Sequence, residues 1–245
     1  MQGVFFDLGG TLFSYRNVPR VTVPLITEAV ARLGAKASGE QIKDAYTQAS
    51  RDTTFAYAER AYYLHADYFR ATFKRFAELL SARHDEAVHD WYLEAHRVAM
   101  VDCLVLKDDC IETLAHLKDC GLYLSVVSNI DDDMLNPLIE REGLARYFDH
   151  WTSSEAAQSC KPDLRFFELA LARAGLAAHQ VLFVGDSPEH DIVGANAAGM
   201  QTALITDGGL APPLQTGRVN VNADHTIATL TELKQIAASA HQRRT

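Results

Sequence analysis

Short apolar segments and amphipathic segments follow one another through most of the chain, and this alternation restricts the possible fold more than any other feature. The apolar segments predict strands at residues 2–7, 122–128, 147–153, 180–186 and 201–206. The amphipathic segments predict helices at residues 110–120, 132–142, 163–174, 187–199 and 226–240. Strands that alternate with helices are typical of a doubly wound parallel sheet, because a parallel connection needs a crossover.

Residues 20–101 interrupt this alternation. They contain only two glycines, and their apolar residues recur at helical spacing, for example Ile26, Val30 and Leu33. We predict an inserted all-helical domain of about four helices at residues 16–101. The remaining residues, 1–15 and 102–245, are expected to form a Rossmann-like α/β core.

Charge and composition exclude several classes of protein. The net charge of −9 disfavours nucleic-acid binding, which needs a basic surface. No apolar run approaches the roughly 20 residues of a membrane span, and the N-terminus lacks the basic region of a signal peptide. Four cysteines without C-x-x-C spacing are expected to be free thiols. These features predict a soluble cytoplasmic protein with a small-molecule partner, and they leave its oligomeric state open.

Three polar residues stand where predicted strands end: Asp7, Ser128 and Asp186. Sites in parallel sheets lie at the carboxyl ends of strands, so these residues are expected to meet. Asp7 in FFDLGGTL is suited to be a covalent nucleophile or a metal ligand, although an ordinary turn aspartate has the same context. Asp186 is followed by Asp191, and an oxygen-rich group of carboxylates is what Mg²⁺ prefers.

Two further segments contain groups that suit a phosphate. Ser128 in VVSN offers a hydroxyl at the start of a helix, where backbone N–H groups also point, although it also suits simple N-capping. Lys161 in CKPD precedes another helix and is suited to neutralise an anion, although a single lysine is more often a solvated surface charge. The run Asp131–Asp133 is interpreted as acidic charge at a helix N-terminus.

The order of these segments carries a resemblance. FFDLGGT, VVSN, CKPD and VGDSPEHDIVGA resemble the four motifs of the haloacid dehalogenase superfamily, over residues 1–15 and about 104–210. The resemblance implies a Mg²⁺-dependent phosphatase that acts on a small phosphorylated metabolite. It also implies that the helical insertion is the cap domain that many members have between the first two motifs. Asp7 would form an aspartyl-phosphate, with Thr11 orienting its loop, while Ser128, Asn129 and Lys161 would bind the phosphoryl group. The metal ligands would be Asp7, the carbonyl of Gly9, Asp186 and Asp191.

Gly9 departs from the family pattern. Most phosphatases of this superfamily have an acid/base aspartate two residues after the nucleophile, and glycine has no side chain to replace it. General acid–base catalysis contributes about 10²–10⁴-fold, so slow turnover is expected unless another group substitutes. The candidates in the cap are Tyr57, Glu59 and His65.

Other functions remain open at this stage. A 2-haloacid dehalogenase also lacks the aspartate, and a phosphonate hydrolase would use a cap lysine, for which Lys36, Lys43 and Lys74 are available. A catalytically weakened regulatory protein that binds a phosphate ligand is the alternative from another class. Most cap aromatics are expected to pack the helices together, with Arg51 or Arg60 as candidates to face a substrate.

Overall fold

A six-stranded parallel sheet forms the centre of the protein, whose computed structural model describes residues 1–206 and 214–242. The strands lie in the order β5-β4-β1-β6-β7-β8. Their bounds are β1 Gly3–Phe6, β4 Tyr123–Ser128, β5 His150–Ser153, β6 Val181–Gly185, β7 Gln201–Ile205 and β8 His225–Ile227. The predicted α/β class with a doubly wound Rossmann-like sheet is confirmed.

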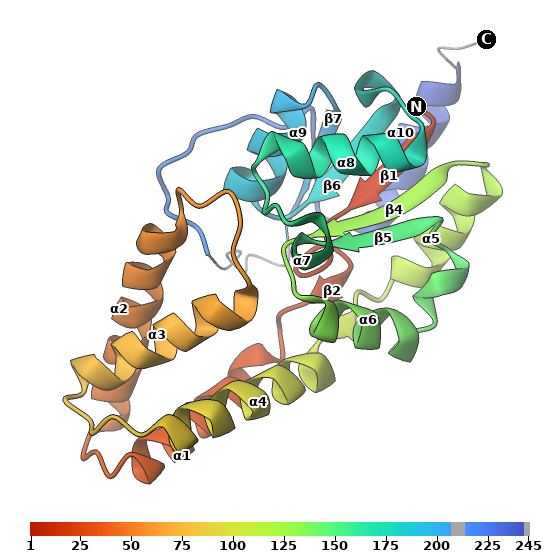
Figure 1. Ribbon diagram of the computed structural model, residues 1–245. Helices are drawn as coiled ribbons and strands as arrows, with labels where there is room; N and C mark the ends of the chain where they lie inside the picture. The colour runs from red at the N-terminus through yellow and green to blue at the C-terminus, as the bar shows by residue number, and fades with distance from the viewer. Residues whose placement is uncertain (207–213, 243–245) are drawn as a thin grey trace.

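Helices cover both faces of the sheet (Figure 1). One face packs on α5 (Cys110–Asp119), α6 (Asp132–Arg141) and α10 (Leu233–Gln242). The other packs on α8 (Leu164–Ala174) and α9 (Val193–Ala197), and the short α7 (Ser154–Ala157) follows β5. The alternation of side chains along each strand explains this arrangement, because successive residues point to opposite faces.

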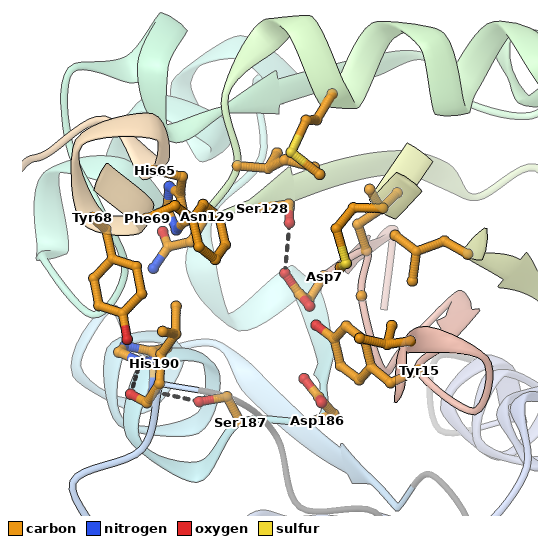
Figure 2. A pocket seen from close by; sticks show the side chains of 18 of the residues that line it. Asp7, Tyr15, His65, Tyr68, Phe69, Ser128, Asn129, Asp186, Ser187 and His190 are labelled. Carbon is orange, nitrogen blue, oxygen red and sulfur yellow. Dashed lines mark hydrogen bonds between the residues drawn. The ribbon is translucent and has the colours of Figure 1, made fainter. Parts of the chain in front are cut away.

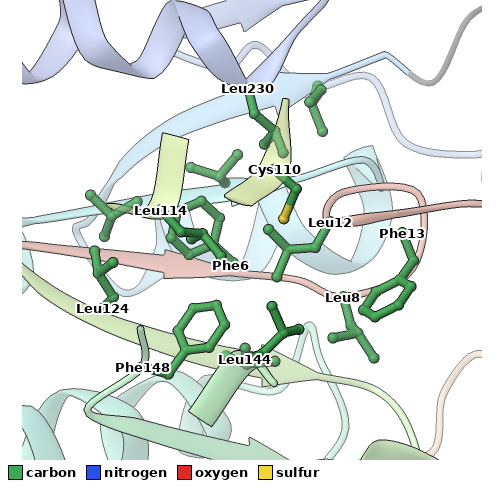
Figure 3. Packing of buried hydrophobic residues seen from close by; sticks show 14 of the residues in the cluster. Phe6, Leu8, Leu12, Phe13, Cys110, Leu114, Leu124, Leu144, Phe148 and Leu230 are labelled. Carbon is green, nitrogen blue, oxygen red and sulfur yellow. The ribbon is translucent and has the colours of Figure 1, made fainter. Parts of the chain in front are cut away.

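The central strand β1 shows this alternation directly. Val4 and Phe6 are fully buried on the face covered by α5 and α6, with Phe6 packed among Leu114, Leu124 and Phe148 (Figure 3). Phe5 is fully buried on the opposite face. A strand that is apolar on both faces can only lie in the middle of a covered parallel sheet.

Four helices form a separate bundle to one side of the sheet (Figure 1). They are α1 Val18–Arg32, α2 Gly39–Tyr57, α3 His65–Leu79 and α4 Glu86–Cys103, and we call them the cap. The cap has its own buried cluster, which contains the predicted stripe of Ile26, Val30 and Leu33. The chain enters and leaves it through a short antiparallel pair, β2 (Phe13–Ser14) and β3 (Val105–Leu106). The division of domains at residues 15 and 101 stays a prediction.

Two predicted helices differ from the structure. Residues 226–240 contain the end of β8 and a 3₁₀ turn, and α10 begins only at Leu233. His225–Ile227 pairs instead with β7, an interaction that local periodicity cannot indicate. The segment after Asp186 starts with a π-helical turn, Pro188–Ile192, before α9. No helix in the described part of the chain is long and apolar enough to cross a membrane.

Candidate functional site

The ends of three neighbouring strands form the site. Asp7 follows β1, Ser128 ends β4 on one side of it, and Asp186 follows β6 on the other side. The chain runs outward from β1 first through β4 and β5, and later in the opposite direction through β6, β7 and β8. This reversal opens a crevice at the carboxyl ends of the strands, as in other doubly wound sheets. The structure thus brings together the three residues that the sequence placed at strand ends (Figure 2).

Asp7 is held by two hydrogen-bond donors. The Ser128 hydroxyl donates to Asp7 Oδ1 over 2.9 Å, and the Lys161 ammonium donates to the same oxygen over 2.6 Å. Lys161 also donates to Asp191 Oδ1 over 2.6 Å, so one ammonium bridges two carboxylates. Lys161 is only 3% exposed. It is therefore not the solvated surface lysine of the alternative interpretation.

Two glycines allow the carboxylates to approach the main chain. A Cβ atom at Gly10 would overlap the Asp186 carboxylate, and φ at Gly10 is +73°. A Cβ atom at Gly185 would overlap the Asp191 carboxylate. As a result Asp7, Asp186 and Asp191, all buried, each offer an oxygen within 4.8 Å of the others.

This group of acids carries more negative charge than Lys161 balances. Burial and the neighbouring Asp7 and Asp191 raise the pKa of Asp186 well above its ordinary value. Burial also raises the pKa of Asp191, although Lys161 opposes this. For Lys161, burial favours the neutral amine, but Asp191 and Asp7 outweigh it and leave the pKa raised. Three oxygen donors with an uncompensated charge of this kind fit a hard divalent cation such as Mg²⁺, with the Gly9 carbonyl as a fourth predicted ligand.

The Lys161 loop is fixed by residues around it. The Asn129 side chain donates to the Lys161 carbonyl over 2.9 Å and accepts from the Lys161 N–H over 2.7 Å. Asn129 was predicted to bind substrate, and these contacts give it a part in positioning Lys161. His190, which the sequence did not single out, lies with Nδ1 3.2 Å from the same carbonyl.

Thr11 was predicted to orient the loop around Asp7. It is fully buried, but its hydroxyl has no hydrogen-bond partner among the described residues. The loop is held by main-chain bonds instead, since the N–H groups of Leu12 and Phe13 both donate to the Leu8 carbonyl over 2.9 Å.

Asp131 joins the cap to the core. Its carboxylate accepts hydrogen bonds of 2.8 Å from the main-chain N–H groups of both His65 and Ala66, at the start of α3. The acidic run was interpreted as negative charge at a helix N-terminus. Asp131 provides this charge at the N-terminus of α3, a cap helix that is far away in the sequence. Burial tends to raise its pKa, but the donors from His65 and Ala66 lower it more.

We expect Asp131→Ala to lower the free energy of unfolding by about 2–3 kcal/mol at pH 7, because two donors of a buried helix end lose a charged acceptor. The pKa of Asp131 is lower in the folded protein, so its stabilisation is present above the unfolded value of about 4 and is lost as the pH falls through the folded value. Urea unfolding at pH 7 and at pH 3.5 measures this. Equal losses at both pH values would contradict this account.

A cavity of about 440 Å³ lies between the cap and the strand ends. Asp7, Gly9, Lys161, Asp186 and Asp191 line its core side. Of the predicted cap residues only His65 lines it, and both ring nitrogens of His65 are buried without a hydrogen-bond partner in the described chain. Tyr57 and Arg60 line a smaller neighbouring cavity of about 170 Å³, which Lys161 and His190 also line. The other predicted cap residues line neither cavity: Glu59, Arg51, Lys36, Lys43 and Lys74.

Known proteins are similar to this chain over most of its length. The sequence model of one protein family, the haloacid dehalogenase-like hydrolases, matches residues 1–199 of this chain. A ribulose-1,5-bisphosphate 5-phosphatase of Halopiger xanaduensis is 30% identical over 96% of this chain and 98% of its own length. A (S)-2-haloacid dehalogenase 4A of Burkholderia cepacia is 26% identical over 97% of this chain and 95% of its own.

The fold is also that of solved hydrolases. The crystal structure of YfnB from Bacillus subtilis, which was determined with bound magnesium, superposes with a TM-score of 0.76. The alignment covers 97% of this chain and 98% of YfnB, at 17% identity. This likeness concerns the arrangement of core and cap alone.

Proposed function

The chain belongs to the haloacid dehalogenase-like hydrolases, and from this we propose that it is a Mg²⁺-dependent phosphatase that hydrolyses a small phosphorylated metabolite through an aspartyl-phosphate. The observation that carries the proposal is the buried group of Asp7, Asp186 and Asp191 around Lys161. A divalent cation bound there would neutralise these carboxylates and would allow the phosphate of a substrate to lie beside them. A cytoplasmic location stays a prediction from the sequence.

The reaction follows from the positions of the side chains. The Asp7 carboxylate attacks phosphorus, and the alcohol of the substrate leaves. Lys161 lies against Asp7 and offsets the repulsion between this carboxylate and the phosphoryl oxygens. The Ser128 hydroxyl donates to Asp7 in the free protein, and its single hydrogen can turn to a phosphoryl oxygen when the phosphate binds. Water then hydrolyses the aspartyl-phosphate and restores Asp7.

Asp7, Asp186, Asp191 and the Gly9 carbonyl would hold Mg²⁺, which when bound supplies positive charge to the phosphoryl oxygens. Asp191 also orients Lys161 through their 2.6 Å contact. The donor set contains oxygen alone, which suits Mg²⁺ rather than a softer transition metal.

Hydrolysis of 4-nitrophenyl phosphate, with Mg²⁺ and after chelation, tests the proposal. We expect turnover that depends on Mg²⁺ and releases one inorganic phosphate for each nitrophenol. Absence of turnover across a broad panel of phosphate esters, with Mg²⁺-dependent phosphate binding retained, would instead support a catalytically weakened regulatory protein.

A 2-haloacid dehalogenase is the second candidate, favoured by Gly9 and by the dehalogenases among the relatives. A halide leaves without a proton, so the missing carboxylic acid would cost nothing. Against it, the substrate carboxylate needs a cation, and among the described residues the cap places neither lysine nor arginine in the cavity. Release of chloride from 2-chloropropionate without Mg²⁺ would favour the dehalogenase. The positions of Lys36, Lys43 and Lys74 likewise give no support to phosphonate cleavage through a Schiff base.

A further inference from the structure

We propose that the organic part of the substrate is an apolar aryl or alkyl group rather than a sugar or a group with a second anion. This inference rests on the proposed phosphatase function, because it takes the phosphate to lie at Asp7. The cap presents a largely apolar wall to the cavity of about 440 Å³, whose size is typical of small-molecule sites.

The cap wall carries no charged side chain. Among the described residues that line the cavity, those of α1 to α4 include no lysine, arginine, aspartate or glutamate. Burial lowers the pKa of His96 to about 4, so this lining histidine is neutral at pH 7. A second phosphate or a carboxylate on the substrate would be buried there without a partner, which is strongly unfavourable.

Three hydroxyl groups of this wall are already engaged within the cap. Tyr68 shares a 2.9 Å hydrogen bond with Thr54, and the Thr72 hydroxyl donates to the Tyr68 carbonyl over 2.9 Å. The Thr22 hydroxyl donates to the Val18 carbonyl over 2.9 Å. The other polar side chains of this wall are His65, whose Nδ1 lies 3.7 Å from Asp131 Oδ1, and His96, Tyr46 and Ser50. These few groups cannot replace the water that several sugar hydroxyls would lose.

Apolar side chains from both sides complete the cavity. Val18, Phe69 and Met100 line it from the cap, and Leu104, Ile130 and Met134 line it around the strand ends. Contact with such surfaces favours an apolar group in proportion to the area removed from water. The cavity therefore combines one site that can bind an anion, at Lys161, with walls that are mostly apolar.

The test compares 2-phenylethyl phosphate with ribose 5-phosphate in the presence of Mg²⁺, because both are esters of primary alcohols and need the same protonation of the leaving group. We expect kcat/KM to be higher for 2-phenylethyl phosphate by about 10²-fold or more, since the sugar leaves buried polar groups unpaired. Equal values, or a preference for ribose 5-phosphate, would overturn the proposal. If neither ester is hydrolysed, the proposed function fails, and calorimetric binding of the same two esters decides on the cavity.

A matched pair of variants locates the effect. Val18 lines the cavity, whereas Val23 on the same helix is 60% exposed. We expect Val18→Lys to lower the ratio of the two kcat/KM values by about tenfold or more, because it places a charge in the apolar wall. Val23→Lys should leave the ratio unchanged. Equal ratios in both variants would place the selectivity outside this cavity.

A different observation concerns the missing side chain at position 9. A Cβ atom at Gly9 would overlap the Tyr15 hydroxyl and lie 2.8 Å from Tyr15 Cζ. Figure 2 shows this hydroxyl directed toward Asp7 and Asp186. We infer that Tyr15 takes the place of the absent acid and donates a proton to the leaving oxygen.

The proposed proton transfer needs only the ester, Asp7, Tyr15 and one water molecule. As the bond between Asp7 and phosphorus forms, the bond from phosphorus to the ester oxygen breaks, and the Tyr15 proton passes to that oxygen. The Tyr15 oxygen then takes a proton from the water that attacks the aspartyl-phosphate. Both steps require the hydroxyl to lie beside Asp7, and both residues line the same cavity.

Tyr15→Phe is expected to act through the leaving group. Turnover of 2-phenylethyl phosphate, whose alcohol is a poor leaving group, should fall by about 10²-fold or more. Turnover of 4-nitrophenyl phosphate should fall much less, because nitrophenolate leaves without a proton. Tyr147→Phe, at a partly buried position that does not line the cavity, is the control and should change neither rate. Equal losses for both esters in Tyr15→Phe, or no loss, would overturn the inference.

The overlap of Tyr15 with a side chain at position 9 also predicts the effect of Gly9→Asp on turnover. Gly9→Asp alone should not raise turnover, because the new side chain must displace Tyr15. In the Tyr15→Ala background, where the space is free, Gly9→Asp should raise 2-phenylethyl phosphate turnover by about tenfold or more. Failure of this rescue, in a double variant whose circular dichroism is unchanged, would contradict the assignment of the two residues to one place.

Discussion

Replacing Asp7 with asparagine is expected to lower kcat for 4-nitrophenyl phosphate by a factor on the order of 10⁵, to the limit of detection. The amide has the shape of the carboxylate but is not nucleophilic toward phosphorus. It also removes the negative charge between Ser128 and Lys161, which donate to Asp7 over 2.9 Å and 2.6 Å. The measurement is initial-rate release of nitrophenol under saturating Mg²⁺.

Asp133→Asn is the matched control for this variant. Its side chain is 60% exposed, it lies outside the cavity, and its kcat should stay within about twofold of wild type. Thermal unfolding shows whether the Asp7 variant remains folded. Turnover of Asp7→Asn within tenfold of wild type would exclude covalent catalysis by Asp7, and with it the proposed mechanism.

The parts of this site that the sequence predicted are those governed by local pattern. Asp7, Ser128 and Asp186 follow apolar segments, and a strand of a parallel sheet ends at the same edge as its neighbours. The helices were predicted for the same reason, and Gly175, with φ of +64°, ends α8 where expected. The glycine at position 185 also has a local cause, the close approach of the Asp191 carboxylate to the main chain.

The remaining parts depend on contacts between distant segments. The pairing of β2 with β3 and of β8 with β7 leaves no local periodicity in such short strands. Asp131 binds the start of α3, 65 and 66 positions earlier in the chain. Tyr15 is only six residues from Gly9 in the sequence, but the overlap of their positions follows from the fold of the loop between them.

The same contacts explain how one core can serve different substrates. The carboxylates and Lys161 come from the ends of strands and from loops held against the sheet. The Lys161 loop meets the cap through Cys160, whose N–H donates to the Ala61 carbonyl over 2.7 Å. Much of the cavity wall comes from the cap, which has its own buried cluster. The phosphatase and dehalogenase relatives are consistent with this separation of chemistry from selectivity.

Asp186→Asn is expected to abolish Mg²⁺-dependent turnover while stabilising the metal-free protein. Burial and repulsion from Asp7 and Asp191 raise the pKa of Asp186, so its ionised form is a cost to the folded state at pH 7.5. An uncharged amide removes this cost, and we expect the free energy of unfolding without metal to rise by about 2 kcal/mol. For a chain of this length that corresponds to roughly 4–8 °C in Tm.

Mg²⁺ should reverse the order of stability. Binding to the folded protein alone stabilises it increasingly as the ion concentration rises above Kd, and wild type gains this while the variant does not. Thermal unfolding with a chelator and then with increasing Mg²⁺ therefore gives two Tm curves that cross. Crossing links the cost of burying three carboxylates to the binding of a cation. If Asp186→Asn is less stable under both conditions, Asp186 is a structural residue and the metal site has been placed wrongly.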